Sequence, residues 1–133
     1  MPDNYILDSS IIAAIFFREK ASTKAVQKIQ DKDLTTVDLA MAEVANVAWK
    51  RVTIFHENKE MIAEALKKSI EFINTVCEVI TTEELIERSF QIALMEKTTL
   101  YDSLFLAASE KEKTPLLTLD KKLKNTTHNV VLL

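Results

Sequence analysis

Four acidic residues stand at positions where a carboxylate could take part in catalysis. Asp8 and Asp120 each directly follow a short apolar run, as at the end of a buried strand. Glu43 lies in an apolar stripe of a predicted helix, where a charge is costly to bury unless a cation compensates it. Asp102 lies in the first turn of a predicted helix and is followed by the apolar run from Leu104 to Leu106. If these side chains meet, they form a strongly negative pocket.

Such a pocket would need a cation. Two unit charges about 4 Å apart repel by about 4 kcal/mol at an effective dielectric near 20, so four carboxylates cannot all stay ionised together. Oxygen ligands without His or Cys favour Mg²⁺ or Mn²⁺ over zinc. The residue types therefore predict a hard divalent cation.

Each acid also has an ordinary structural explanation. Asp8 and Asp120 could be simple helix N-caps, and Asp102 could be the third residue of a capping box that Thr99 begins. Glu43 could reach solvent at the margin of its stripe. Taken singly, these explanations are the more common ones. Taken together they are less satisfactory, because Asp8 and Asp120 would share one crevice at the ends of parallel strands.

The elements that must position these residues alternate between short apolar runs and helical patterns. We expect strands at 5–7, 34–37, 77–80, 116–119 and 130–133. We expect helices at 11–20, 23–30, 38–55, 57–75, 81–97 and 100–113, with Asp38 or Thr36 capping the third. Strands that alternate with helices predict an α/β fold with a parallel sheet, formed by residues 1–133 as a single domain.

Composition excludes several classes of protein. The 133 residues contain no Gly, which excludes the Gly-rich loops that cradle phosphates. One Cys and two His cannot form an internal disulfide or a soft tetrahedral zinc site. The longest apolar run has seven residues, against about 20 for a membrane span. The N-terminus lacks the basic segment of a secretory signal, so we expect a cytoplasmic protein.

Four segments resemble the PIN domain, and within it the short VapC-type toxins of prokaryotic toxin–antitoxin pairs. The segments are Tyr-Ile-Leu-Asp-Ser-Ser at 5–10, Glu-Val-Ala-Asn-Val at 43–47, Tyr-Asp-Ser-Leu-Phe-Leu-Ala at 101–107, and Leu-Leu-Thr-Leu-Asp-Lys-Lys-Leu at 116–123. No single segment is specific to the family, but the four occur in order across almost the whole chain. The resemblance implies a three-layer PIN-like fold, with a mostly parallel sheet of four to five strands flanked by helices.

The resemblance also implies a function, namely a metal-dependent endoribonuclease that is the toxin of a type II pair. The family's acidic quartet falls on Asp8, Glu43, Asp102 and Asp120, and its supporting hydroxyls fall on Ser10 and Thr118. The quartet would hold one or two Mg²⁺ or Mn²⁺ ions, with Asp8 and Asp120 in direct contact. Hydrolysis by water would leave a 5′-phosphate and a 3′-hydroxyl. The family commonly forms homodimers and binds an antitoxin.

Basic residues near the quartet are candidates for binding the RNA backbone. Because the overall charge is −3, any RNA binding must rely on a local positive patch. The candidates are Lys50, Arg51, Lys121 and Lys122. Trp49 and Phe55 could stack on a base, although at helical spacing core or interface positions are more common. The long helix could also present an interface through Ala42, Ala45, Val52 and Phe55.

Three other functions are open at this stage. A non-toxin PIN nuclease of RNA maturation or decay would use the same chemistry, and only the absence of a neighbouring antitoxin gene would distinguish it. A catalytically silent PIN-like binding module would normally lack one of the acids. A phosphoacceptor receiver domain would need paired acids after the first strand and a Lys late in the chain at a strand end, where this sequence has Asp120.

Overall fold

The computed structural model describes residues 2–133. At the centre of these residues is a sheet of five parallel strands in the order β3-β2-β1-β4-β5. The strands are β1 (Asn4–Leu7), β2 (Asp33–Val37), β3 (Glu78–Ile80), β4 (Leu116–Thr118) and β5 (Val130–Leu132). This arrangement confirms the predicted α/β fold with its mostly parallel sheet of four to five strands.

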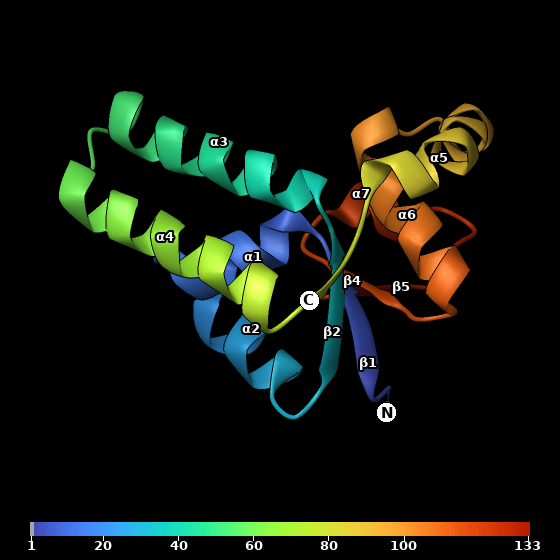
Figure 1. The fold of residues 1–133 in the computed structure, drawn as a ribbon, viewed down its shortest axis with the longest axis horizontal. Helices are drawn as coiled ribbons and strands as arrows, with labels where there is room; N and C mark the ends of the chain where they lie inside the picture. Colours follow the sequence, from blue (N-terminus) through green and yellow to red (C-terminus); the bar gives the residue numbers. More distant parts are fainter. Residues whose placement is uncertain (1) are drawn as a thin grey trace.

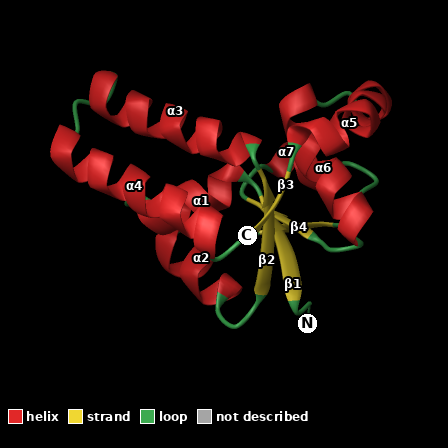
Figure 2. Ribbon diagram, in the orientation of Figure 1, coloured by secondary structure: helices red, strands yellow, loops and turns green. Residues whose placement is uncertain are grey.

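Helices cover both faces of the sheet (Figures 1 and 2). One side carries α1 (Ser9–Phe16), α2 (Ser22–Ile29), α3 (Leu39–Thr53) and α4 (Lys59–Thr75). The other side carries α5 (Thr82–Glu96) and α6 (Leu100–Glu112), and the short α7 (Lys121–Lys124) follows β4. The paired helices α3 and α4 extend well beyond the sheet at the left of Figure 1. Among the described residues, no helix is long and apolar enough to span a bilayer.

The strand order reverses at β1. From β1 the chain adds β2 and then β3 on one side, and it later returns to add β4 and β5 on the other. In open parallel sheets, ligands bind beyond the carboxyl ends of the strands at such a reversal. The fold therefore directs attention to the residues that follow β1 and β4.

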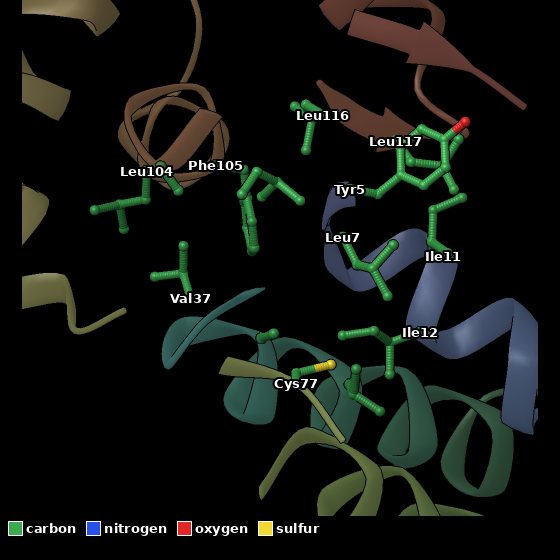
Figure 3. Close-up of a cluster of buried hydrophobic side chains, with 14 of the residues drawn as sticks. Tyr5, Leu7, Ile11, Ile12, Val37, Cys77, Leu104, Phe105, Leu116 and Leu117 are labelled. Atoms are coloured by element: carbon green, nitrogen blue, oxygen red, sulfur yellow. The ribbon is translucent and has the colours of Figure 1, made fainter. Parts of the chain in front are cut away.

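The core explains why the strands read as continuous apolar runs. Tyr5, Ile6 and Leu7 of β1 are buried on both faces, because helices pack against each side of the sheet. In Figure 3, Leu7 lies between Ile12 of α1 and Phe105 of α6. Within residues 2–133, every buried side-chain nitrogen and oxygen has a hydrogen-bond partner. The sheet is thus a rigid support for the side chains at its edge.

Several predicted boundaries shift in the structure. The first helix begins at Ser9 rather than at residue 11, because the Asp8 carboxylate already caps it, and it ends at Phe16. The helix predicted from residue 57 begins at Lys59, after the Asn58 side chain caps it. The strand predicted at 116–119 ends at Thr118. The single turn of α7 was not predicted.

Asp38 occupies the N-cap position of α3, as predicted, but its side chain makes no cap hydrogen bond. Its Oδ1 accepts hydrogen bonds from the backbone N–H of Thr82 (2.9 Å) and from the Thr82 hydroxyl (2.5 Å). The Thr36 hydroxyl donates instead to the carbonyl oxygen of Leu7 (2.7 Å). Both side chains join strands or helices that are distant in sequence, a use that local cap patterns do not reveal.

Turns are made without glycine. Four residues with side chains adopt the left-handed backbone conformation, which glycine usually occupies: Asp31, His56, Lys97 and Lys113, with φ between 52° and 60°. Lys97 ends α5 and Lys113 ends α6. The turn at Lys97 leads from α5 to α6, and the turn at Lys113 leads from α6 to β4.

Arg51, in the last turn of α3, forms ion pairs with residues of two loops. Its guanidinium pairs with Glu19 after α1 (3.3 Å) and with Glu57 before α4 (3.2 Å), and it lies 5.7 Å from the ring centroid of Phe17. The Arg51 side chain is only 16% exposed. A half-buried charge with two partners and an aromatic neighbour contributes more than a surface ion pair. Arg51 therefore has a structural role.

We predict that Arg51→Ala lowers the free energy of unfolding by about 1–3 kcal/mol, because it leaves Glu19 partly buried without its cation. Urea denaturation of both proteins measures the difference. Lys50→Ala, at the exposed neighbouring position, is the matched control and should change stability by less than about 0.5 kcal/mol. Equal effects of the two variants would contradict the role assigned to Arg51.

Candidate active site

The four acids lie around the crevice at the carboxyl ends of β1 and β4. Asp8 follows β1 and caps α1, and Asp120 follows β4 and caps α7. Asp102 is in the first turn of α6, and Glu43 is in the second turn of α3. Each carboxylate is thus near a helix N-terminus, whose partial positive charge favours an anion.

Asp8 is the most deeply buried of the four, with 6% of its surface exposed. Its Oδ1 accepts hydrogen bonds from the Ser10 hydroxyl (2.6 Å) and the backbone N–H of Ile11 (3.2 Å). Its Oδ2 accepts a hydrogen bond from the Thr118 hydroxyl. The structure therefore places both predicted supporting hydroxyls directly on the Asp8 carboxylate.

The same hydroxyls connect Asp8 to the segment that carries Asp120. The Ser10 hydroxyl accepts a hydrogen bond from the backbone N–H of Leu119 (3.1 Å). The Thr118 hydroxyl accepts one from the backbone N–H of Asp120 (3.0 Å). Because each hydroxyl contacts both segments, the relative positions of Asp8 and Asp120 are fixed by the network.

Burial raises the pKa of Asp8 to about 6, from an ordinary value of 3.8. Removal of water from the carboxylate is the largest cause, and the nearby charge of Asp102 adds to it. The hydrogen bonds from Ser10, Thr118 and Ile11 act in the opposite direction and lower the pKa. The Asp8 carboxyl is therefore harder to ionise than that of an ordinary aspartate.

Glu43 is half-buried and is held by Ser9, whose hydroxyl donates to Oε1 at 3.1 Å. Burial raises the pKa of Glu43, and the charges of Asp102 and Asp8 raise it further, while the bond from Ser9 lowers it. The predicted violation of the apolar stripe is therefore real. Glu43 is near enough to Asp102 and Asp8 for their charges to raise its pKa, and it remains partly exposed.

Asp102 belongs to α6, on the opposite side of the sheet from α1 and α3. Its backbone N–H donates to the Thr99 hydroxyl (3.1 Å), as the capping-box pattern predicts. Burial raises the pKa of Asp102, and the charge of Asp120 raises it further. A hydrogen bond from the Thr99 side chain to the carboxylate and the positive charge of Lys122 lower it. The charges of Asp120 and Lys122 therefore both affect the pKa of Asp102.

Each acid acts electrostatically on at least one other, so the four form one group. Burial has a larger effect on the pKa values than mutual repulsion, which the sequence argument had treated as dominant. Within residues 2–133, no group of three or more Asp, Glu, His or Cys side chains is arranged so that it could by itself hold a metal ion.

The predicted RNA-contacting residues differ in their surroundings. Lys50, Lys121 and Lys122 are exposed, and the latter two are in α7 beside Asp120. Arg51 is already engaged in the ion pairs described above. Trp49 and Phe55 are exposed, so the core positions considered for them are wrong.

Sequence reasoning missed two residues of the site. It gave Ser9 no part in the site, although the Ser9 hydroxyl donates a hydrogen bond to Glu43. It gave no role to Tyr101, which is 59% exposed although the seven residues from Ser103 to Ser109 in the same helix are buried. The N-cap pattern after Asp8 could have indicated that Ser9 begins a helix. A Tyr directly before Asp102 carries no such signal.

Comparison with known proteins identifies what the chain is similar to. A family model described as "PIN domain" matches residues 5–129. Ribonuclease VapC3 of Pyrobaculum aerophilum is 34% identical over 119 residues, which cover 89% of this chain and 90% of that relative.

Two solved structures share the fold. PAE2754 from Pyrobaculum aerophilum superposes with a TM-score of 0.74 at 21% identity, covering 96% of this chain and 82% of that one. A toxin–antitoxin complex from Klebsiella pneumoniae gives a TM-score of 0.72 at 18% identity, covering 96% and 95%.

We predict that, without divalent cations, Asp8 makes the protein less stable as pH rises from below 4 to above 6. The folded state binds this proton more tightly than the unfolded state, so the loss of the proton favours unfolding. A pKa of about 6 against 3.8 corresponds to about 3 kcal/mol.

Urea denaturation in EDTA at several pH values measures this effect. Asp8→Asn cannot ionise, so its stability relative to the natural protein should increase by about 3 kcal/mol over the same pH range. Asp33→Asn, at the other end of the sheet, should follow the pH dependence of the natural protein. A stability difference between Asp8→Asn and the natural protein that does not change with pH would contradict the account of Asp8.

Proposed function

This chain is a PIN-domain protein of the VapC type, and from that premise we propose that it is an endoribonuclease that hydrolyses RNA phosphodiester bonds with Mg²⁺ or Mn²⁺. The observation that carries the proposal is the group of four electrostatically coupled carboxylates at the strand-order reversal. Reactions of a phosphodiester require positive charge beside the phosphate. In this crevice an ion would supply it.

The donor set fits a hard divalent cation. All the candidate ligands are carboxylate oxygens, and burial raises the pKa of three of the four, so a bound cation would favour their ionised forms. Asp8 and Asp120 would be direct ligands, and Glu43 and Asp102 would bind directly or through water. When bound, one or two ions would orient the phosphate and lower the pKa of an attacking water.

The side chains around the acids keep the carboxylates in position. Ser10 and Thr118 hold both oxygens of Asp8, and Ser9 holds one oxygen of Glu43. Water is the proposed nucleophile, so the products should carry a 5′-phosphate and a 3′-hydroxyl. Lys121 and Lys122, on the helix that Asp120 caps, would contact the RNA backbone.

We further propose that this nuclease is the toxin of a toxin–antitoxin pair. The 34% identical relative bears the name Ribonuclease VapC3, and a structure of similar fold is a toxin–antitoxin complex. A PIN nuclease of RNA maturation or decay would have the same site. A silent binding module is disfavoured because the whole acidic quartet is present.

Two exposed apolar surfaces support contacts with other proteins. The α5 surface consists of Phe90, Leu94 and Met95, and the hairpin surface, at the end of α3 that leads to α4, consists of Trp49, Ile54 and Phe55. Of the residues considered for an interface, Ala42 and Phe55 are exposed, and Ala45 and Val52 are partly buried. We propose that a second copy packs on the α5 surface and the antitoxin on the hairpin surface.

We predict that the purified protein cleaves single-stranded RNA in Mg²⁺ or Mn²⁺ and loses at least about 100-fold of its rate in excess EDTA. Asp8→Asn should lose a similar factor, since it removes a proposed direct ligand. Asp33→Asn, which also removes one carboxylate but far from the crevice, should keep full activity. Mapping of the product ends should find 5′-phosphates.

Two further readouts separate the mechanism from contamination. Mn²⁺ should raise the Tm of the natural protein, and Asp8→Asn combined with Asp120→Asn should remove most of that rise. Cleavage that persists in EDTA, or that Asp8→Asn leaves unchanged, would exclude the proposed reaction.

We also predict that the natural protein is a dimer and that Leu94→Glu makes it a monomer, because a charge would be buried in the contact. Light scattering coupled to size exclusion measures the mass against 15.1 kDa for one chain. Val26→Glu, at an exposed apolar position of α2, should leave the dimer intact. A monomeric natural protein, or an unaffected Leu94→Glu dimer, would rule out the proposed contact.

A further inference from the structure

A groove of about 370 Å³ lies directly beside the acidic group. Ser9 and Glu43 line it, and so do Asn46, Lys50 and Tyr101. Its volume is within the range of roughly 300–1,000 Å³ that is usual for small-molecule sites. Because Glu43 belongs to both the groove and the acidic group, a molecule in the groove would be adjacent to the reacting phosphate.

The groove combines one exposed aromatic ring with one exposed cation. Tyr101 is 59% exposed, and it directly precedes Asp102, so its ring and an acid of the site come from the same helical turn. Lys50 lies two turns after Glu43 on α3 and lines the same groove. An aromatic plane beside a cation is the arrangement with which proteins bind the base and the phosphate of single-stranded nucleic acid.

The helical period explains why Tyr101, and not the more prominent Trp49, is the stacking residue here. Glu43, Asn46 and Lys50 are at positions i, i+3 and i+7 of α3 and share one face. Trp49 lines a different groove, together with Ile62 of α4. The side of α3 that carries Trp49 therefore faces away from the acids.

We propose that this groove binds one nucleotide of single-stranded RNA next to the scissile phosphate, with its base stacked on Tyr101 and its backbone phosphate near Lys50. The inference rests on the proposed ribonuclease function and adds a substrate-positioning site to it. Double-stranded RNA could not use the site, because its bases are stacked on one another and are not free to pack on a side chain.

The test is the affinity for a short single-stranded RNA, measured by fluorescence anisotropy in the Asp8→Asn background so that no RNA is cut. Tyr101→Ala should raise the Kd by about 5- to 150-fold, the effect expected for the loss of one stacked base. Tyr101→Phe keeps the ring and should stay within about twofold of the background. Val76→Ala removes an apolar side chain that is 56% exposed, outside this groove and outside both proposed protein contacts, and should have no effect.

Lys50→Ala provides a second, independent readout. It should weaken binding and reduce the slope of log Kd against log salt concentration by about 0.7, as expected for one lost phosphate contact with a single strand. Tyr101→Ala should leave that slope unchanged. The two variants thus separate stacking from charge.

The outcomes distinguish this inference from the proposed function. If the natural protein cleaves RNA but Tyr101→Ala binds it as well as the background does, the nucleotide site is wrong and the nuclease stands. If Tyr101→Ala becomes monomeric, the groove is a contact between copies of the chain, and the nucleotide site is also wrong. If the natural protein neither binds nor cleaves RNA, both proposals fail.

Discussion

The site depends on the burial of one carboxylate, that of Asp8, at the end of the central strand. Desolvation opposes its charge, and three hydrogen bonds partly compensate this cost. Two of the donors, Ser10 and Thr118, also hold the segment that leads to Asp120. The hydrogen bonds that offset the cost of burying the Asp8 carboxylate therefore also hold Asp8 and Asp120 in place relative to each other, although the two residues are 112 positions apart in the sequence. A cation in the crevice would complete a compensation that the protein leaves partial.

The ordinary and the functional explanations of the acids turn out to be compatible. Asp8 and Asp120 are N-caps, and Asp102 follows a Thr cap, just as the structural explanation holds. The same residues also meet in one crevice, because the parallel sheet brings the beginnings of several helices to one edge. Local patterns were therefore sufficient to predict the fold and the positions of these acids. The short apolar strands and the helix caps after β1 and β4 are encoded by neighbouring residues, so the sequence predicts them as the structure has them.

Other features depend on contacts that no local pattern encodes. Asp38 looks like a cap but holds the start of α5 through Thr82, and Arg51 looks like an RNA contact but joins two loops. Ser9 and Tyr101 become notable only once α3 and α6 are placed beside one another. The relative weight of burial and repulsion was also inaccessible from sequence, since it depends on how much water each carboxylate loses. Side-chain contacts between helices and strands that are distant in sequence are therefore the features that only the three-dimensional structure reveals.

The left-handed turns have a consequence for the denatured chain. At Asp31, His56, Lys97 and Lys113 the native backbone carries a steric cost of roughly 1–2 kcal/mol each, which glycine would avoid. A chain without glycine, however, has fewer conformations open to it when unfolded, and so it loses less entropy on folding. The absence of glycine therefore costs backbone strain at four turns and lowers the conformational entropy of the unfolded chain. It also means that the protein has no glycine hinges.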